Sequence, residues 1–376
     1  MDRDAAGQNP GIYCLAPESG WNNQQLTKNC GVLPYLFYRE YGFHAVMAGV
    51  RNGSYPALER YVKGLEMEFL PDASMAAGMA YISQRAVDMD VLVLHGPFAY
   101  YLPLLDHYRQ LRPDGKVYLE LDLNIYSAER LDWDRPEFRR FLSQCTVVGA
   151  SCRRMQQYLS AKWPCVIEYI PNGFYNFAQV DLRGDFAQKQ NIILTVGRIG
   201  TAQKRNETLL QAFARAADSL TGWQVVLAGA VTDSFRGWLE SFFAEYPQLR
   251  ERVVLTGMIE DKAELMAWYR RAKIFALTSE LEGGTPNVVA EALNSGCYMI
   301  TSEIDGAADI TDFGRCGRSF PIGDAAALAG LLPTVCGDAE LMRRGGEHAI
   351  GYAQRTFDFQ RILARLYYLL FQEVRL

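Results

Sequence analysis

Two groups of side chains in the second half of the sequence have the types and spacing needed to bind a phosphorylated ligand. The first group lies in residues 195–204, where a predicted strand ends at Gly197 and a loop leads to a predicted helix. Arg198 follows the strand and Lys204 precedes the helix. An arginine fork and a lysine point charge can hold a diphosphate from two sides. Two solvated surface charges are the alternative for this spacing.

The second group, residues 278–296, contains a short predicted helix with clear ends. Thr285 is a good N-cap residue, Pro286 suits the first helical position, and Gly296 suits a C-terminal stop. Backbone N–H groups in the first turn of a helix lack intrahelical partners and attract anions. We therefore expect an anion site with amide donors at Asn287, Val288 and Val289.

Two glycines and a carboxylate complete this second group. Gly283 and Gly284 would let a ligand approach the backbone closely. Glu291 lies four residues after Asn287 and therefore on the same face of the helix. Its carboxylate can accept hydrogen bonds from ribose hydroxyls. A partly solvated helix charge is the alternative, which the apolar neighbours of Glu291 make less favourable.

The sequence predicts parallel sheets as the scaffold for these residues, because short β-branched runs alternate with turns and helical segments. A polar, weakly patterned segment at 182–190 separates two such series. We therefore expect domains at 1–184 and 185–354, with a final helix at 355–376 that packs back on the first. The predicted strands are 11–15, 44–49, 65–69, 91–94, 116–121, 146–149, 166–170, 191–196, 224–228, 253–256, 274–277 and 298–301.

Taken together, these residues resemble the GT-B glycosyltransferases, specifically the retaining family 4 type. Residues 197–204 resemble the family's diphosphate-binding segment, and Glu282 with Glu291 resembles its paired glutamates. Two further stretches agree: residues 147–151 followed by Ile-Pro-Asn-Gly at 170–173, and Thr256-Gly257 before a predicted helix at 261–271. The resemblance covers residues 145–325 well and the first 140 residues in outline.

The resemblance implies an α/β GT-B fold, with two doubly wound Rossmann-like domains facing each other across a cleft. It implies retaining, metal-independent transfer of a sugar to a glycan, glycolipid or small-molecule acceptor. The nucleoside diphosphate sugar is then a co-substrate, and no cofactor is expected. The second domain would bind this donor and the first would shape the acceptor side. The implied substrate-binding residues are Arg198, Lys204, Gly283, Gly284, Thr285, Pro286, Asn287, Val288 and Glu291.

The implied catalytic residues are Glu282 and one residue of the first domain. Eight residues separate Glu282 from Glu291 where the family usually has seven, which leaves the role of Glu282 open. The family often has a histidine at the end of a middle strand of the first domain. Here His95 follows one predicted strand and Asp122 follows the next, so either could take that place. A sugar-nucleotide epimerase and a catalytically silent scaffold are the alternative functions.

Composition and charge exclude several classes of protein. The chain has 376 residues, of which 49% are hydrophobic and 22% charged, so overall disorder is excluded. The net charge of −5 argues against a nucleic-acid partner. The eight cysteines form no C-x-x-C pair and are expected to be buried hydrophobes. Asp132 and Asp134 form a D-x-D pattern, which their arginine neighbours mark as a solvated helix start rather than a metal site.

The sequence also gives expectations about location. Residues 1–4 are charged and no run of about 20 apolar residues occurs, so we expect a cytoplasmic protein. From Phe359 onward an apolar face opposes Arg361, Arg365, Gln372 and Arg375. This helix could lie on a membrane, and docking on the protein's own core is the favoured interpretation. Peripheral membrane contact and the oligomeric state therefore stay open.

Overall fold

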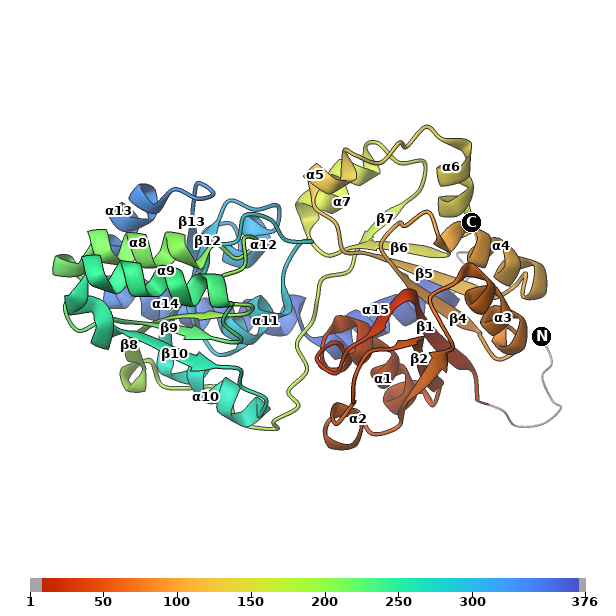
Figure 1. Cartoon of the computed structure of the whole chain (residues 1–376), viewed down its shortest axis with the longest axis horizontal. Helices are drawn as coiled ribbons and strands as arrows, with labels where there is room; N and C mark the ends of the chain where they lie inside the picture. The colour runs from red at the N-terminus through yellow and green to blue at the C-terminus, as the bar shows by residue number, and fades with distance from the viewer. Residues whose placement is uncertain (1–8, 372–376) are drawn as a thin grey trace. The chain divides into compact units, whose positions relative to one another are not determined.

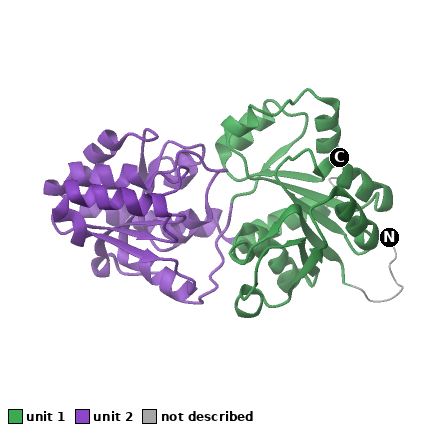
Figure 2. Ribbon diagram, in the orientation of Figure 1, with its two compact units in different colours: residues 1–171, 359–376 green, residues 172–358 purple. Residues whose placement is uncertain are grey.

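A computed structural model describes residues 9–371 of the chain, which form two compact units (Figures 1 and 2). Unit 1 comprises residues 1–171 and 359–376, and unit 2 comprises residues 172–358. The first boundary thus lies earlier than the expected one after Gly184. Residues just after Pro171 pack on unit 2, where Leu182 is buried in the core. The charged residues 1–4, Gln372 and Arg375 lie outside the described residues.

Unit 1 is built on a seven-stranded parallel sheet in the order β3-β2-β1-β4-β5-β6-β7. Its strands are β1 (Gly11–Trp21), β2 (His44–Arg51), β3 (Leu65–Leu70), β4 (Val91–His95), β5 (Lys116–Leu121), β6 (Val147–Ala150) and β7 (Ile167–Tyr169). Strand β1 is longer than predicted, since a register irregularity after Ala16 lets it continue to Trp21. Residues 17–21, beyond the predicted end of this strand at residue 15, therefore belong to it.

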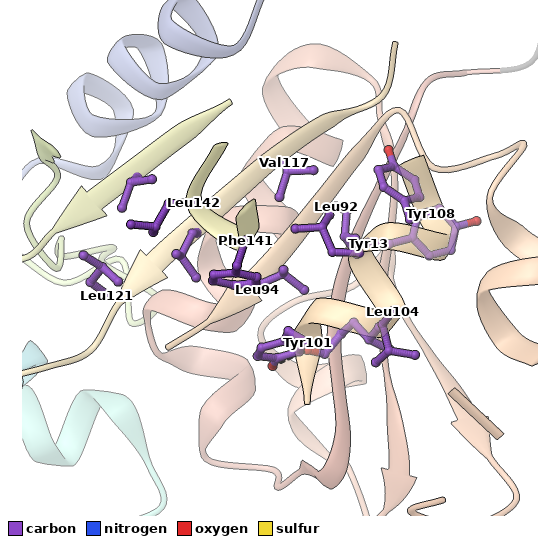
Figure 3. Packing of buried hydrophobic residues seen from close by; sticks show 14 of the residues in the cluster. Tyr13, Leu92, Leu94, Tyr101, Leu104, Tyr108, Val117, Leu121, Phe141 and Leu142 are labelled. Carbon is purple, nitrogen blue, oxygen red and sulfur yellow. Dashed lines mark hydrogen bonds between the residues drawn. The ribbon is translucent and has the colours of Figure 1, made fainter. Parts of the chain in front are cut away.

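Helices cover both faces of this sheet. They are α1 (Asn29–Tyr41), α2 (Ala57–Arg60), α3 (Met75–Arg85), α4 (Tyr101–Leu111), α5 (Ile125–Ala128), α6 (Pro136–Ser143), α7 (Arg153–Ser160) and α15 (Phe359–Phe371). Side chains of α3, α4, α6 and α7 share one core cluster with alternate residues of β1, β4 and β5 (Figure 3). Helices α1 and α15 pack against each other and the sheet outside that cluster. The apolar face of α15 is buried within unit 1, as Ile362 and Leu366 show.

Unit 2 has a six-stranded parallel sheet in the order β10-β9-β8-β11-β12-β13. Its strands are β8 (Gln190–Val196), β9 (Gln224–Ala228), β10 (Val253–Gly257), β11 (Ala272–Leu277), β12 (Tyr298–Ser302) and β13 (Gly317–Phe320). Strand β13 was not predicted, because it is a four-residue edge strand with exposed Arg318 and Ser319 at its centre. The other predicted strands are present, with ends that differ by a few residues.

The helices of unit 2 also lie on both faces of its sheet. They are α8 (Asn206–Arg215), α9 (Asp233–Glu245), α10 (Lys262–Arg271), α11 (Asn287–Asn294), α12 (Ala307–Thr311), α13 (Ala325–Cys336) and α14 (Ala339–Thr356). Helices α8, α9 and α13 pack on one face, while α10, α11 and α14 pack on the other. Among the described residues no single helix is long and apolar enough to cross a membrane, although α13 and α14, bent by 94°, pass that test as a pair.

Each sheet has one point where the strand order reverses. In unit 1 this point lies between the neighbouring strands β1 and β4, and in unit 2 it lies between β8 and β11. The connections leaving two such neighbouring strands run to opposite faces of the sheet, which leaves a crevice beyond the strands' carboxyl ends where α/β sheets bind ligands. The loops that follow β8 and β11 contain the two groups of side chains identified in the sequence.

Candidate functional site

The candidate site in unit 2 is formed by the loops after β8 and β11, which hydrogen bonds tie together. The Glu280 amide donates to the carbonyl of Gln203 at 2.8 Å, and the Thr278 hydroxyl donates to the carbonyl of Lys204 at 2.9 Å. An exposed ion pair joins Arg205 to Glu280 at 2.6 Å. The two loops are therefore held as one surface, although nearly 80 residues of sequence separate them.

Arg198 and Lys204, the predicted diphosphate cations, lie in different surroundings. Arg198 is exposed, and its Nη2 donates to Oε1 of Gln203 at 2.5 Å. Gln203 in turn donates from Nε2 to Glu282 Oε2 at 3.1 Å. Lys204 is mostly buried and its ammonium pairs with Glu282. A phosphate can thus reach the Arg198 fork from solvent, whereas Lys204 already has an anionic partner.

Glu282 is the central acceptor of this network. Its side chain is 8% exposed and that of Lys204 is 13% exposed. Besides the Lys204 ammonium, the Ser279 hydroxyl and the Gln203 amide donate to its carboxylate. A carboxylate removed from water is stable only when its lone pairs are satisfied in this way. The structure therefore turns Glu282 inward as the counter-ion of Lys204.

Glycines at the ends of the strands allow the loops to pass close together. Gly284 is buried with φ +117°, a conformation that other residues rarely adopt. A Cβ atom on Gly306 would lie 2.6 Å from the Gly284 carbonyl oxygen. At the end of β9, Gly229 has φ +142°, and a Cβ there would lie 1.8 Å from the Gly197 carbonyl oxygen. Larger side chains at these glycines would push the site loops apart.

Helix α11 presents its first turn at this loop without a side-chain cap. The N-cap residue is Pro286, not Thr285 as predicted, and it makes no side-chain cap hydrogen bond. Thr285 is instead buried in the preceding loop, where its carbonyl accepts from Asn172 Nδ2 at 2.9 Å. Proline has no donor or polar side chain to offer, so the helix start remains suited to an external anion.

Glu291 lies on α11, and a buried tyrosine fixes its direction. The hydroxyl of Tyr269, on α10, donates to Glu291 Oε2 at 2.7 Å. Burial, and then the charge of Glu291, raises the pKa of Tyr269 well above its ordinary value. Tyr269 therefore remains a donor at any physiological pH and orients the carboxylate. Nothing in the sequence distinguishes Tyr269 from the other apolar residues of its predicted helix, so it was not predicted as a site residue.

Lys189 was also missed, because it lies in the polar segment taken as a linker. It is buried, and its ammonium donates to the Ala272 and Ser295 carbonyls at 2.9 Å. It also donates to the Tyr269 and Arg270 carbonyls at 3.4 Å and 3.1 Å. These carbonyls lie at or beyond the C-terminal ends of α10 and α11, where a cation is favourable. Lys189 thus anchors the end of α11 opposite its candidate anion site.

In unit 1, His95 and Asp122 follow neighbouring strands. His95 is the last residue of β4, at the point where the strand order reverses, and is partly buried. Asp122 comes directly after β5 and is exposed. One polar contact of His95 is with Glu120, whose Oε2 lies 3.1 Å from His95 Nδ1. Glu120 was not predicted as a site residue, because a charged residue near a strand end is common.

The Asp132 and Asp134 pattern lies on the surface just before α6. Asp132 pairs with Arg135 at 3.0 Å and Asp134 with Arg139 at 2.8 Å, and all four side chains are exposed. This agrees with a solvated helix start. Across residues 9–371, no three His, Cys, Asp or Glu side chains form a group that could hold a metal ion.

Comparisons with known proteins agree with this architecture. Residues 190–338 match the family described as glycosyl transferases group 1. The phosphatidyl-myo-inositol mannosyltransferase of Mycobacterium leprae is 22% identical over 289 residues, which cover 74% of this chain and 72% of the relative.

Solved structures resemble the chain over nearly its whole length. Sucrose-phosphate synthase from Thermosynechococcus elongatus superposes with a TM-score of 0.73 at 18% identity, covering 96% of this chain and 98% of that one. Anabaena HepE in complex with UDP and glucose gives a TM-score of 0.71 at 15% identity, covering 96% and 98%. The fold predicted from the sequence is therefore confirmed. The chain has two Rossmann-like units of the GT-B type, and residues 190–338 of its second unit match the family described as glycosyl transferases group 1.

Proposed function

We propose that this chain transfers a sugar from a nucleoside diphosphate sugar to an acceptor with retention of anomeric configuration and without a metal ion. The observation that carries the proposal is the joined pair of loops after β8 and β11, in which Arg198 and Lys204 of the first loop are linked to Glu282 of the second. The start of α11 belongs to the same loop sequence as Glu282 and lacks a side-chain cap. HepE, which has a similar fold, is described in complex with UDP and glucose.

The proposed donor site gives each part of the nucleotide a partner. The Arg198 fork and the amides of Asn287 and Val288 would bind the diphosphate, while Gly283 and Gly284 let it approach the backbone. Glu291, held by Tyr269, would accept from the ribose hydroxyls. The sugar would then lie beyond the diphosphate, on the side of the glycine loop.

The proposed chemistry is electrostatic. As the bond between the sugar and the diphosphate breaks, negative charge grows on the leaving phosphate, and fixed cations and amide dipoles stabilise it. No carboxylate is required as a covalent nucleophile in this scheme. The acceptor hydroxyl would attack from the face that the phosphate leaves, and its proton would pass to a phosphate oxygen. The new bond would therefore keep the configuration of the donor.

Product release and stereochemistry test this proposal. The protein is incubated with a panel of α-linked nucleoside diphosphate sugars and candidate sugar, glycolipid and small-molecule acceptors, with and without excess chelator. Acceptor-dependent release of the nucleoside diphosphate that persists in chelator, with an α-linked product by proton NMR, is the expected result. A β-linked product or a strict need for added metal would contradict the mechanism. Conversion of the donor sugar without any acceptor would instead indicate an epimerase.

A further inference from the structure

A buried polar cluster at the carboxyl end of the unit 1 sheet is unexplained by the proposed donor site. It comprises Asn29 at the start of α1, His95 at the end of β4, and Glu120 on β5. Glu120 is 8% exposed and Asn29 is 6% exposed. His95 and Glu120 are register partners in adjacent parallel strands. A carboxylate held this far from water is costly, and buried groups of this kind concentrate at functional sites.

The contacts of Glu120 define the state of the His95 ring. Asn29 Nδ2 donates to Glu120 Oε1, and Glu120 Oε2 lies 3.1 Å from His95 Nδ1. Two lone pairs would repel at that separation, so Nδ1 must carry the proton when Glu120 is ionised. The Asn29 amide therefore fixes the Oε1 side of the carboxylate and leaves Oε2 directed at the His95 ring. The pair is at ion-pair distance without the alignment of a good hydrogen bond, since Oε2 has no hydrogen-bond partner by geometry.

The other ring nitrogen of His95 has no such partner. Nε2 is buried and makes no hydrogen bond to any residue in the described part of the chain. The indole of Trp21, at the end of β1, packs edge to face on the His95 ring with centroids 5.1 Å apart. Trp21 is itself held by a hydrogen bond from its Nε1 to the Ala48 carbonyl at 3.1 Å. Thus the ring is fixed on one side by Trp21 and on the Nδ1 edge by Glu120.

We propose that Glu120, anchored by Asn29, is a positioning residue that holds His95 in its Nδ1–H tautomer, so that Nε2 offers a lone pair to a hydroxyl of the carbohydrate substrate. The identification of the substrate as a carbohydrate rests on the proposed transferase function, whereas the tautomer of His95 does not depend on that function. A neutral imidazole in water favours the Nε2–H form, in which Nε2 could donate but not accept. Glu120 reverses that choice by placing its carboxylate charge 3.1 Å from Nδ1, which favours a proton on that nitrogen. Carboxylates that contact one ring nitrogen commonly fix the tautomer of a functional histidine in this way.

The test measures the tautomer and the kinetics separately, using the full chain. Only four histidines occur, so the long-range proton–nitrogen NMR signals of His95 can be assigned with a His95→Gln variant. In the parent protein at pH 8, we expect Nδ1 protonated and Nε2 as the bare nitrogen. In Glu120→Gln, the side-chain amide can donate to Nδ1, so the Nε2–H tautomer should appear. We expect kcat for sugar transfer to fall about 10- to 100-fold with little change in donor KM.

Glu68→Gln is the matched control. Glu68 is another mostly buried carboxylate of unit 1, and it accepts from Tyr81 at 2.8 Å and from Arg85 Nε at 3.0 Å. This variant should leave the His95 tautomer and kcat unchanged. Asn29→Ala provides a second variant, expected to weaken the preference for Nδ1–H without removing the carboxylate. An Nε2–H tautomer in the parent protein, or an unchanged tautomer in Glu120→Gln, would overturn the proposal. If the tautomers behave as expected but no sugar is transferred, the proposed function fails instead.

Discussion

Replacing Glu282 by glutamine distinguishes two roles for this residue, as the counter-ion of Lys204 or as a group that acts on the sugar. If Glu282 is the counter-ion that holds Lys204 in place, replacing it by glutamine leaves a mostly buried ammonium without its anion. Removing one partner of a buried pair costs about 3–5 kcal/mol, and charges about 4 Å apart attract by about 4 kcal/mol at an effective dielectric constant of 20. Because Lys204 keeps some exposure, we expect Glu282→Gln to lower the unfolding free energy by about 2–4 kcal/mol.

The same substitution should strengthen nucleoside diphosphate binding. The phosphates would replace the Glu282 carboxylate as the negatively charged partner of Lys204. The affinity for the nucleoside diphosphate should therefore rise about 10-fold, or roughly 1.4 kcal/mol. Chemical unfolding of unit 2 and calorimetric titration with UDP, GDP and ADP measure the two effects. Glu280→Gln is the matched control, since the Glu280 pair with Arg205 is exposed and worth about 0–1 kcal/mol. Unchanged stability and nucleotide affinity in Glu282→Gln, with sugar transfer lost, would show that Glu282 acts on the sugar.

Three further predictions concern residues around the site and the core. Lys189→Met should lower the unfolding free energy by about 3 kcal/mol in denaturant titrations, because it leaves buried carbonyl groups at the ends of α10 and α11 without a hydrogen-bond donor. An unchanged midpoint would refute that role. Tyr269→Phe should weaken binding of nucleoside diphosphates about 10-fold by releasing Glu291, yet leave pyrophosphate binding unchanged. Equal losses for both ligands would contradict a ribose contact. Burial raises the pKa of Cys336 from 9.0 to about 12, so this thiol's contribution is fully present below pH 9 and is lost as pH rises toward 12. Cys336→Ala should therefore reduce the alkaline slope of the unfolding free energy by about 1.4 kcal/mol per pH unit; an unchanged slope would argue against a buried neutral thiol.

The sequence was informative where a local pattern determines the structure. Strands such as β9 and β5 were predicted with their correct ends because a short β-branched or apolar run is bounded by turn residues. Residue type and short spacing led to the prediction of a phosphate and ribose site at Arg198 and Glu291, and this role stays a prediction. The four-residue strand β13 was missed, since its alternating polar residues look like a loop unless a neighbouring strand is known.

Pairings over long sequence separations could not be predicted. Lys204 and Glu282 were both identified, but nothing local indicates that they neutralise each other across 78 residues. Glu120 was passed over because its partners, Asn29 and His95, are brought to it by strand order and by the start of α1. The polar segment containing Lys189 looked like a linker, although the fold buries its ammonium against helix ends. Such contacts depend on tertiary packing, which composition and periodicity do not reveal.

The proposed donor site depends above all on binding of the diphosphate by Arg198 and its neighbouring loops. Calorimetric titration of UDP, GDP and ADP into the parent protein and Arg198→Ala tests it most directly, with Arg215→Ala as a control at the exposed far end of α8. A charge-assisted contact contributes about 1.5–3 kcal/mol, so we expect a 10- to 100-fold loss of affinity in Arg198→Ala for whichever nucleotide binds. Arg215→Ala should bind as the parent does. Equal affinities in the parent and Arg198→Ala would contradict the claim.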